Sequence, residues 1–259
     1  FLRHWSEGIP IVVTDLKMQG NWGPEYFIEQ YGTTEVTLED CETEVVWPSK
    51  VVDFFQTFLE VGKWTRITKL KVSSLLYTKS TSSHGMQDWP LRENFSTKLL
   101  ELHKSFAKFV PCPALVLPDG VLNAALHYPL NGIAPDTGPK MYFAYKTVSD
   151  DHHNGSTKLH MDLTDAVNVM LWASPDPDKQ PGYALWRIFP ATSAPLLHRF
   201  IREECGFTGP RDPVHSQCIY LSPNKCELFF KKYGIRPYTI RQYPNQAVFI
   251  PAYCAHQVG

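Results

Sequence analysis

The sequence lacks several features that mark common classes of protein. No uninterrupted apolar stretch reaches the roughly 18 residues that a membrane-spanning helix needs, so we expect no membrane association. Long runs of like charge are missing, and 25 Lys and Arg residues nearly balance 26 Asp and Glu residues. The basic surface of a nucleic-acid-binding domain is therefore not expected, and we predict no direct binding of DNA or RNA by this segment.

The sequence also has few cysteines. Its six cysteines include no C-x-x-C pair, which argues against a zinc ribbon or a thioredoxin-like redox site. Six thiols in 259 residues fall well below the density of a secreted disulfide scaffold. We therefore expect buried free thiols and a reducing, intracellular compartment.

What the sequence does contain is enough apolar material for a large core. With 43% hydrophobic and 13% aromatic residues, its 259 residues suit one large β-rich domain. We expect a support region over residues 1–137 and a β core over residues 138–259. The chain starts at Phe1 and stops three residues after His256, so we expect a segment of a longer protein.

The first half of the chain is predicted to mix helices and short strands. The pattern predicts a helix over Phe1–Glu7, a buried strand over Ile11–Thr14, extended segments over Thr34–Glu39 and Glu44–Trp47, a helix capped by Ser49, an exposed loop over Lys79–Gly85 and a helix between Leu91 and Val110. Prolines crowd the stretch from Pro111 to Pro139, which indicates irregular connections.

The second half is predicted to be mostly β. Strands are expected over Met141–Thr147, Leu159–Leu163, Ala166–Trp172 and Ala184–Phe189, with helices over Pro195–Glu204 and Ser222–Tyr233. Ser222 should cap the second helix and Gly234 should end it. The segments Tyr238–Tyr243 and Ala247–Pro251 read as a hairpin-like pair that delivers His256 just beyond its end.

A candidate metal site lies in this β half. His160 and Asp162 form an H-x-D pair in a strand-like run, and alternate residues of a strand point to the same face. His256 follows an apolar strand and a proline 96 residues later. Two imidazoles and a carboxylate on one face would suit Fe(II) and would leave positions open for a bidentate cosubstrate and O2.

The same residues also have ordinary interpretations. About one H-x-D match is expected by chance in a chain with ten histidines, so His160 alone is more often a core or surface histidine. His256 could be a turn histidine at a barrel rim. The remaining histidines have no ligand-like context, and we expect them to be structural or exposed: His4, His84, His103, His127, His152, His153, His198 and His215.

A series of ordered segments resembles the Jumonji-C oxygenases, and among them the histone H3 lysine-nine demethylases. The segments are HWSEGIPIVV (4–13), WGPEYF (22–27), MQDWP (86–90), GPKMYFAY (138–145), STKLHMDLTDAVNVM (156–170), GYALWRIF (182–189) and AVFIPAYCAHQV (247–258). The resemblance covers nearly the whole chain. It implies a mainly β fold with flanking helices, a double-stranded β-helix or jelly roll, and dependence on Fe(II), 2-oxoglutarate and O2.

The resemblance also implies roles for individual residues. It assigns His160, Asp162 and His256 to iron, and it makes Thr157 and Asn168 hydrogen-bonding partners of 2-oxoglutarate, since hydroxyl and amide groups can donate to a carboxylate. Thr157 could instead simply end a turn, and Asn168 could satisfy backbone groups at a strand edge.

Two further positions are less settled. Tyr142 matches the position where related enzymes set a group near the methylated ammonium, although core packing would explain it equally well. Many Jumonji-C enzymes place a lysine at the register held here by Ala184, where it pairs with the distal carboxylate of 2-oxoglutarate. That contact must come from elsewhere, with Lys146, Lys179 and Arg187 as candidates, or the cosubstrate is held more weakly.

The activity that the resemblance implies is demethylation of mono- or dimethyl-lysine on histone H3 by hydroxylation of an N-methyl group, in the nucleus. One alternative is hydroxylation of another protein side chain at the same iron site. A second is a chromatin scaffold without catalysis, which the departure at Ala184 keeps open.

Overall fold

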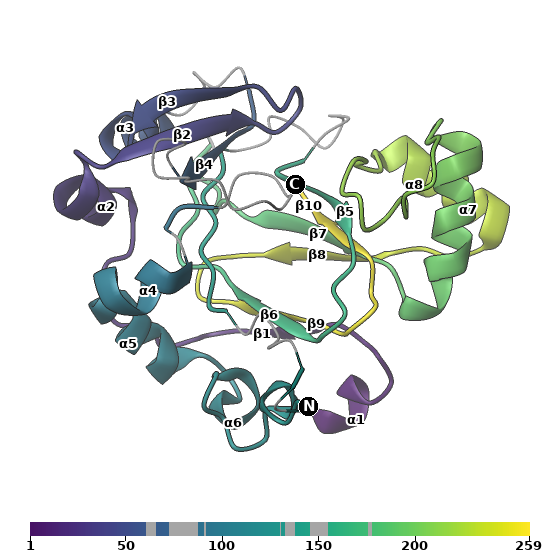
Figure 1. Cartoon of the computed structure of the whole chain (residues 1–259), viewed down its shortest axis with the longest axis horizontal. Coiled ribbons are helices and arrows are strands. Elements are labelled where there is room, and N and C mark those ends of the chain that lie inside the picture. The colour runs from purple at the N-terminus through teal and green to yellow at the C-terminus, as the bar shows by residue number, and fades with distance from the viewer. Residues whose placement is uncertain are drawn as a thin grey trace. The chain divides into compact units, whose positions relative to one another are not determined.

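The computed structural model describes residues 1–60, 66–72, 88–90, 92–129, 131–132, 138–145, 155–175 and 178–259, and the chain divides into two compact units (Figure 1). Unit 1 comprises residues 1–14, 146–175 and 180–259, and unit 2 comprises residues 15–145 and 176–179. In the part of the chain that is described, no helix is both long enough and apolar enough to span a membrane.

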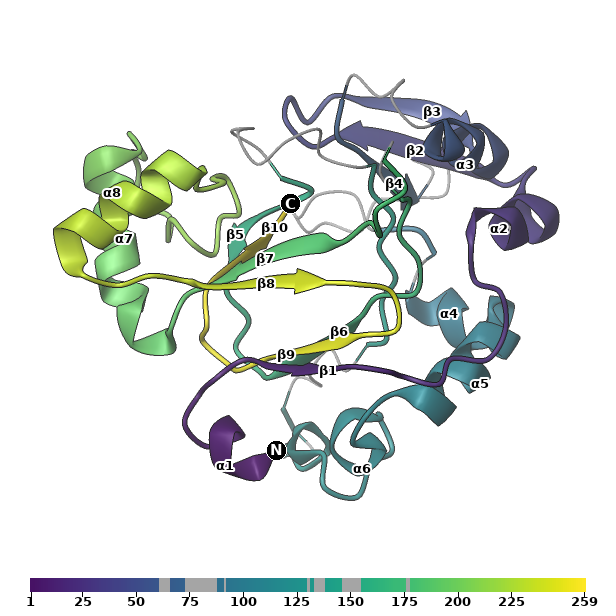
Figure 2. The same ribbon diagram turned by 180° about the vertical axis from the view of Figure 1, so that it is seen from behind.

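Unit 1 contains two antiparallel sheets. Its strands are β1 (Ile11–Val13), β5 (Thr157–His160), β6 (Ala166–Val169), β7 (Ala184–Ile188), β8 (Tyr238–Gln242), β9 (Ala247–Ile250) and β10 (His256–Val258). One sheet has the order β1-β9-β6 and the other has the order β5-β10-β7-β8. In both views β8 runs between β7 and the first sheet (Figures 1 and 2).

A shared apolar core joins the two sheets. Trp186 and Ile188 of β7 are buried in one cluster with Val248 and Ile250 of β9 and with Cys254. Because β7 and β9 belong to different sheets, these side chains lie between the sheets, which pack face to face. The alternation of strand side chains then defines an inner face, toward this core, and an outer face.

Helices cover the outer face of the larger sheet. They are α7 (Ala194–Glu204), which follows the short 3-10 turn η2 (Ala191–Ser193), and α8 (Pro223–Tyr233). Leu159 of β5 packs in a fully buried cluster with Phe200 of α7 and Phe229 of α8, whose ring centroids lie 5.2 Å apart. As predicted, Ser222 caps α8 and Gly234, at φ 71°, ends it.

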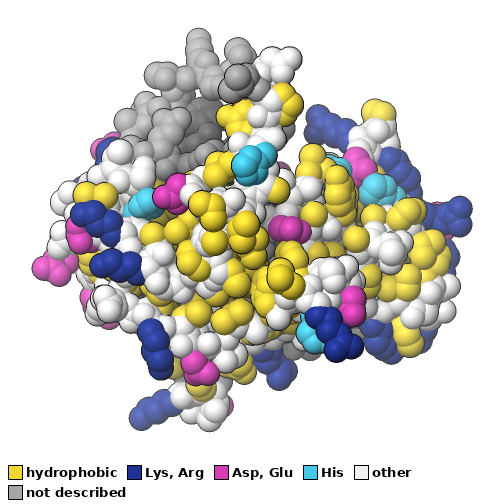
Figure 3. Space-filling view, turned by 90° about the horizontal axis from the view of Figure 1, so that it is seen from below, with side chains coloured by type: hydrophobic (Ala, Val, Ile, Leu, Met, Phe, Trp, Pro, Cys, Tyr) yellow, Lys and Arg dark blue, Asp and Glu magenta, His cyan; other side chains and the backbone are white. Residues whose placement is uncertain are grey.

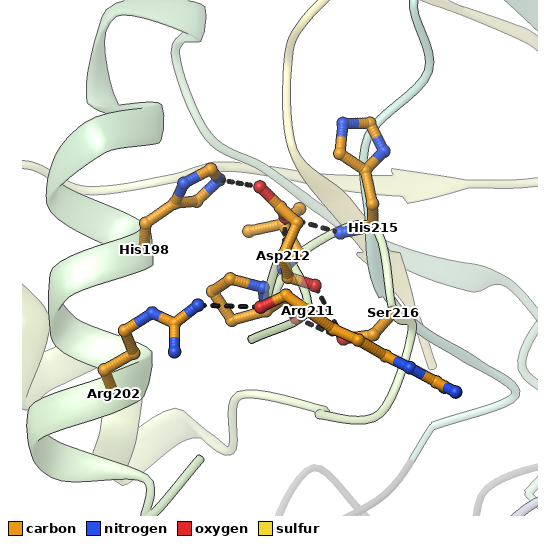
Figure 4. A network of polar contacts seen from close by, with 8 residues as sticks. His198, Arg202, Arg211, Asp212, His215 and Ser216 are labelled. Carbon is orange, nitrogen blue, oxygen red and sulfur yellow. Dashed lines mark hydrogen bonds and ion pairs between the residues drawn. The ribbon is translucent and has the colours of Figure 1, made fainter. Parts of the chain in front are cut away.

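A polar network holds the loop after α7 against that helix (Figure 4). Arg202 donates to the carbonyls of Gly209 at 2.8 Å and Arg211 at 2.7 Å. The Asp212 carboxylate accepts from the backbone N–H groups of Val214 and His215, and His198 Nε2 lies 3.4 Å from it. Those backbone hydrogen bonds outweigh the effect of burial and lower the pKa of Asp212. The loop is therefore held by hydrogen bonds from the Arg202 and Asp212 side chains to backbone groups.

The outer face of the smaller sheet is apolar. Phe249 of β9 pairs with Ile11 and Val167 in its neighbouring strands. Phe1 and Trp5, at the ends of the short helix α1 (Leu2–Trp5), pack edge-on against the Phe249 ring. The view from below shows hydrophobic side chains over much of this side of the molecule (Figure 3).

Unit 2 is built on a three-stranded sheet with helices. Its elements are α2 (Pro24–Tyr31), β2 (Glu35–Asp40), β3 (Val46–Lys50), α3 (Val51–Leu59), β4 (Thr68–Val72), α4 (Arg92–Lys98), α5 (Leu100–Phe109), α6 (Pro113–Val116) and the 3-10 turn η1 (Ala124–Leu126). The strand order is β3-β2-β4. Phe27 of α2 stacks on Phe55 of α3 at 5.2 Å between ring centroids, so aromatic rings form its core.

Several local predictions for unit 2 were wrong. Ser49 does not cap a helix, because β3 runs through Lys50 and α3 begins at Val51 without a side-chain cap. The single helix expected between 91 and 110 is broken at Leu99 into α4 and α5. In the segment Met141–Thr147 the described residues form only an isolated bridge from Ala144 to Lys69. The loop expected over Lys79–Gly85 lies outside the described residues.

The most consequential error concerns the predicted hairpin. β8 pairs with β7, whereas β9 pairs with β1 and β6, so the turn between them passes from one sheet to the other. A short turn between two strands carries the same sequence pattern in both cases, and only the partner strands decide between them. β5 also ends at His160, so Asp162 follows the strand instead of lying within it.

The cysteines fit the prediction only in part. All six are free, but only Cys41 and Cys254 are buried, while Cys218 is exposed.

Candidate metal centre

Strand pairing brings the two predicted histidine ligands together. β10 lies between β5 and β7 in the larger sheet, and His256 stands directly opposite His160. The ring centroids of the two histidines are 4.2 Å apart. The ladder thus joins two residues that are 96 positions apart in the sequence.

Asp162 completes the group. One donor atom from each of His160, Asp162 and His256 lies within 4.8 Å of the others. His256 Nε2 is 3.8 Å from Asp162 Oδ2, and the aspartate side chain is about half exposed whereas His256 is buried. The three side chains meet at one point, as the sequence predicted.

Backbone contacts fix which nitrogen each ring presents. His160 Nδ1 lies 2.9 Å from the carbonyl of Lys158, and His256 Nδ1 lies 2.9 Å from the carbonyl of Cys254. Because a carbonyl only accepts, both Nδ1 atoms carry hydrogen in these contacts. Each Nε2 is then left with a free lone pair, and the ring orientation is set before any metal binds.

The charge state of His256 also favours metal binding. Burial of the ring, together with the electrostatic effect of the neighbouring His160, lowers the pKa of His256 to about 4. Its imidazole is therefore neutral near pH 7, and a neutral imidazole is the form that binds metals.

Two hydrogen bonds tie the loop after β5 to the turn before β10. The backbone N–H of Tyr253 donates to the carbonyl of Asp162 at 3.0 Å. The N–H of Ala252 donates to the Asp165 carboxylate at 2.7 Å. Asp162 and His256 are thereby held in a fixed relation. Asp165 was not predicted, although an aspartate three residues after a candidate ligand could have suggested a turn.

A β-bulge places Thr157 on the same face as His160. In the β5–β10 ladder His160 pairs with His256 while Thr157 pairs with Val258, so three steps on β5 match two on β10. Residues paired directly across a ladder share a face, and Val258 packs against the core between the sheets. Thr157 therefore faces inward with the metal group, which the regular alternation of a strand would not allow.

Asn168 faces the same interior from the other sheet. It pairs with Val248 of β9, whose side chain is fully buried in the core between the sheets. Ala184 of β7 also packs against that core, so the register at which the sequence resemblance led us to look for a lysine is on the inner face. Here a methyl group occupies it.

Arg187 lies on the opposite face from the metal group. It pairs with Gln257, whose side chain makes two hydrogen bonds to the backbone of Leu221 on the outer face of the sheet. Arg187 donates to the hydroxyl of Tyr220 at 3.0 Å. The proposed contact of Arg187 with the distal carboxylate of 2-oxoglutarate is therefore not supported by its direction.

The other three candidates are Lys146, Lys179 and Tyr142. Lys146 lies outside the described residues. Lys179 and Tyr142 belong to unit 2, where both are exposed.

The donor set fits a divalent iron ion. Two imidazole nitrogens and one carboxylate oxygen are the ligands of non-haem Fe(II) oxygenase sites, which keep further positions open. The Asp162 side chain is about half exposed and His256 is buried, so the group is reached by solvent at the aspartate. Trp186 was not predicted as a site residue, and its ring centroid lies 5.9 Å from that of His256.

Comparison with known proteins agrees with this geometry. Residues 151–259 match the family described as JmjC domain, hydroxylase. The whole chain is 31% identical to lysine-specific demethylase 3A of Rattus norvegicus and of Homo sapiens, and 30% identical to lysine-specific demethylase 3 of Drosophila melanogaster. It spans 24%, 22% and 34% of those proteins, respectively. Residues 151–259 are therefore a JmjC domain, a domain with a cupin-like jelly roll, and the His160, Asp162 and His256 grouping lies within the matched residues.

Proposed function

We propose that this chain is the catalytic core of an Fe(II)- and 2-oxoglutarate-dependent dioxygenase that removes methyl groups from mono- or dimethyl-lysine of histone H3. One observation carries the proposal: donor atoms of His160, Asp162 and His256 lie within 4.8 Å of one another inside the JmjC match. His160, Asp162 and His256 would hold the iron. The curated relatives named as lysine-specific demethylases support the choice of substrate.

The protein residues would position the reactants. Fe(II) and 2-oxoglutarate, when bound, supply the oxidising chemistry with O2. Thr157 and Asn168 pair with residues of the inner faces of the two sheets, and their hydroxyl and amide groups would donate hydrogen bonds to the cosubstrate carboxylates. The apolar core beside Trp186 would keep water from the inner side.

The net reaction follows from the substrate class. An N-methyl group, O2 and 2-oxoglutarate give a hydroxymethyl amine, succinate and CO2, and the hydroxymethyl amine then loses formaldehyde. Tyr142 would contribute to binding of the methylated ammonium, since an aromatic face attracts a cation. A histone substrate implies a nuclear protein, and the balance of charge suits a peptide partner without direct nucleic-acid binding.

We infer further that the two face-to-face sheets form a double-stranded β-helix. Residues 138–259 would supply most of its core, to which β1 adds one strand, and the rest of residues 1–137 its support, within a single catalytic domain of a longer protein. The inner faces of both sheets carry proposed site residues, which fits such an architecture.

Mass spectrometry of methylated histone H3 peptides tests the activity. Incubation with Fe(II), 2-oxoglutarate and O2 should remove the mass of one CH2 group per cycle. A stable gain of one oxygen would instead favour hydroxylation of another side chain at the same iron site. Retained turnover in His160→Ala would contradict the assigned ligands.

A chromatin scaffold without catalysis is the second candidate, and Ala184 is the observation that favours it. The inner register that could hold a lysine holds a methyl group, and Arg187 points to the outer face. An anaerobic titration of the Fe(II) protein with 2-oxoglutarate, followed by the weak visible absorption of the chelate, separates the two. A scaffold would develop no such absorption.

A further inference from the structure

Gln242 lies at the seam between the two sheets of unit 1. β8, which ends at Gln242, is an edge strand of the larger sheet, and β6 is an edge strand of the smaller one. Gln242 is fully buried, and it pairs with Ala184 on the inner face. A buried amide needs hydrogen-bonding partners, because its polar atoms lose their hydrogen bonds to water on burial.

The partners of Gln242 come from both sheets. Its Oε1 accepts from Trp186 Nε1 of β7 at 2.8 Å. Its Nε2 donates to the carbonyl of Asn168 on β6 at 3.0 Å and to the carbonyl of Gln246 at 3.1 Å. One side chain thus connects the tryptophan beside His256 with the backbone of Asn168, and it does so in the core between the sheets.

The arrangement of His160, Asp162 and His256, the metal group, does not depend on Gln242. His160 and His256 pair directly with each other in the larger sheet, and Asp162 is tied to Tyr253 by the backbone. Both histidine rings take their orientation from nearby carbonyls. Asn168, in contrast, stands on the other sheet, so its distance from the metal depends on how the sheets are held together at their seam.

We propose that Gln242 is a positioning residue for 2-oxoglutarate, because it fixes β6 so that Asn168 faces the metal group at the correct distance. The inference rests on the proposed function. Gln242 itself touches neither metal nor cosubstrate in this assignment. Its amide can bond to both sheets because its oxygen accepts from the Trp186 indole while its nitrogen donates to two carbonyls.

The test is Gln242→Met, which preserves side-chain length and removes all three hydrogen bonds. We expect the Kd for 2-oxoglutarate, measured by anaerobic titration of the Fe(II) protein, to rise about tenfold, the scale of a lost supporting contact. The Kd for Mn(II), a redox-inert probe of the metal group, should stay within about twofold, because no ligand depends on Gln242. The KM for 2-oxoglutarate should rise in parallel, with little change in kcat.

Gln246→Met is the matched control. Gln246 lies in the same turn, and its own side chain accepts from the N–H of Tyr243 at 3.0 Å. Its backbone carbonyl, which Gln242 uses, is unchanged by the substitution. This variant should bind 2-oxoglutarate as the wild-type protein does.

Gln242→Glu provides a second variant if the methionine is poorly tolerated. The carboxylate still accepts from Trp186 but sets an anionic oxygen against the carbonyls of Asn168 and Gln246. Affinity for 2-oxoglutarate should therefore fall as pH rises and the new carboxyl group ionises, a trend that the wild-type protein should not share. Unchanged 2-oxoglutarate affinity in both variants, or an equal loss of Mn(II) affinity, would overturn the role of Gln242. A wild-type protein that fails to bind 2-oxoglutarate would instead refute the proposed function.

Discussion

His160 and His256 face each other across two antiparallel strands, with ring centroids 4.2 Å apart. Neither position is set by local sequence alone, because each histidine depends on the partner strand for its place. Their Nδ1 atoms are nevertheless held locally, each by a carbonyl two residues earlier in the chain. The ladder therefore sets where the rings meet, while local backbone sets which nitrogen they offer.

The first prediction concerns the ligands themselves. Asp162→Asn removes the anionic donor and should weaken Mn(II) binding by more than about 100-fold, since loss of a supporting contact alone costs 10–100-fold. Isothermal titration under nitrogen measures the affinity. His215→Ala, which removes an exposed imidazole elsewhere in unit 1, should leave it unchanged. Equal affinities for the Asp162→Asn and wild-type proteins would remove Asp162 from the ligand set.

A second prediction concerns Asp165, which holds the turn before His256 through the N–H of Ala252. Asp165→Ala should weaken Mn(II) binding about tenfold, because Asp162 and His256 would no longer be held in a fixed relation. It should also lower the free energy of unfolding by about 1 kcal/mol, the scale of one hydrogen bond. Asp165→Asn keeps an acceptor oxygen and should recover most of both losses. If Asp165→Asn recovers neither loss, the negative charge of Asp165, and not its hydrogen bond, holds the turn.

A third prediction concerns packing around Gly155, two residues before β5 begins. A Cβ added there would lie 2.3 Å from the carbonyl oxygen of Val258 and 2.4 Å from the ring of Tyr220. Gly155→Ala should therefore lower the free energy of unfolding by about 1–3 kcal/mol. Urea denaturation measures the change. The neighbouring Ser156→Ala should cost less than about 0.5 kcal/mol, because its hydroxyl makes only a long contact of 3.4 Å.

Helix ends were predictable because their causes are local. Ser222, Pro223 and Gly234 act within one turn of α8, and the helix begins and ends where these residues place it. The convergence of His160, Asp162 and His256 was also predictable, from the residue types and the resemblance to the Jumonji-C family.

Features that depend on a partner strand were not predictable. The bulge that turns Thr157 inward is a property of the β5–β10 ladder, and the residues of β5 alone do not predict it. The separation of β8 and β9 into different sheets likewise follows from their partners. Arg187 looked like a candidate anion partner in the sequence, but the register with Gln257 directs it to the outer face.

The last prediction concerns acid stability of the metal-free protein. The pKa of His256 is lowered to about 4 in the folded protein, from an ordinary value near 6.5. Between these values the unfolded chain binds a proton that the folded chain does not, so stability is full above pH 6.5 and is lost as pH falls toward 4. The contribution of this group to the slope is at most about 1.4 kcal/mol per pH unit. His256→Gln should flatten the pH dependence of the free energy of unfolding in this range, measured by urea denaturation in chelator; an unchanged slope would contradict the lowered pKa.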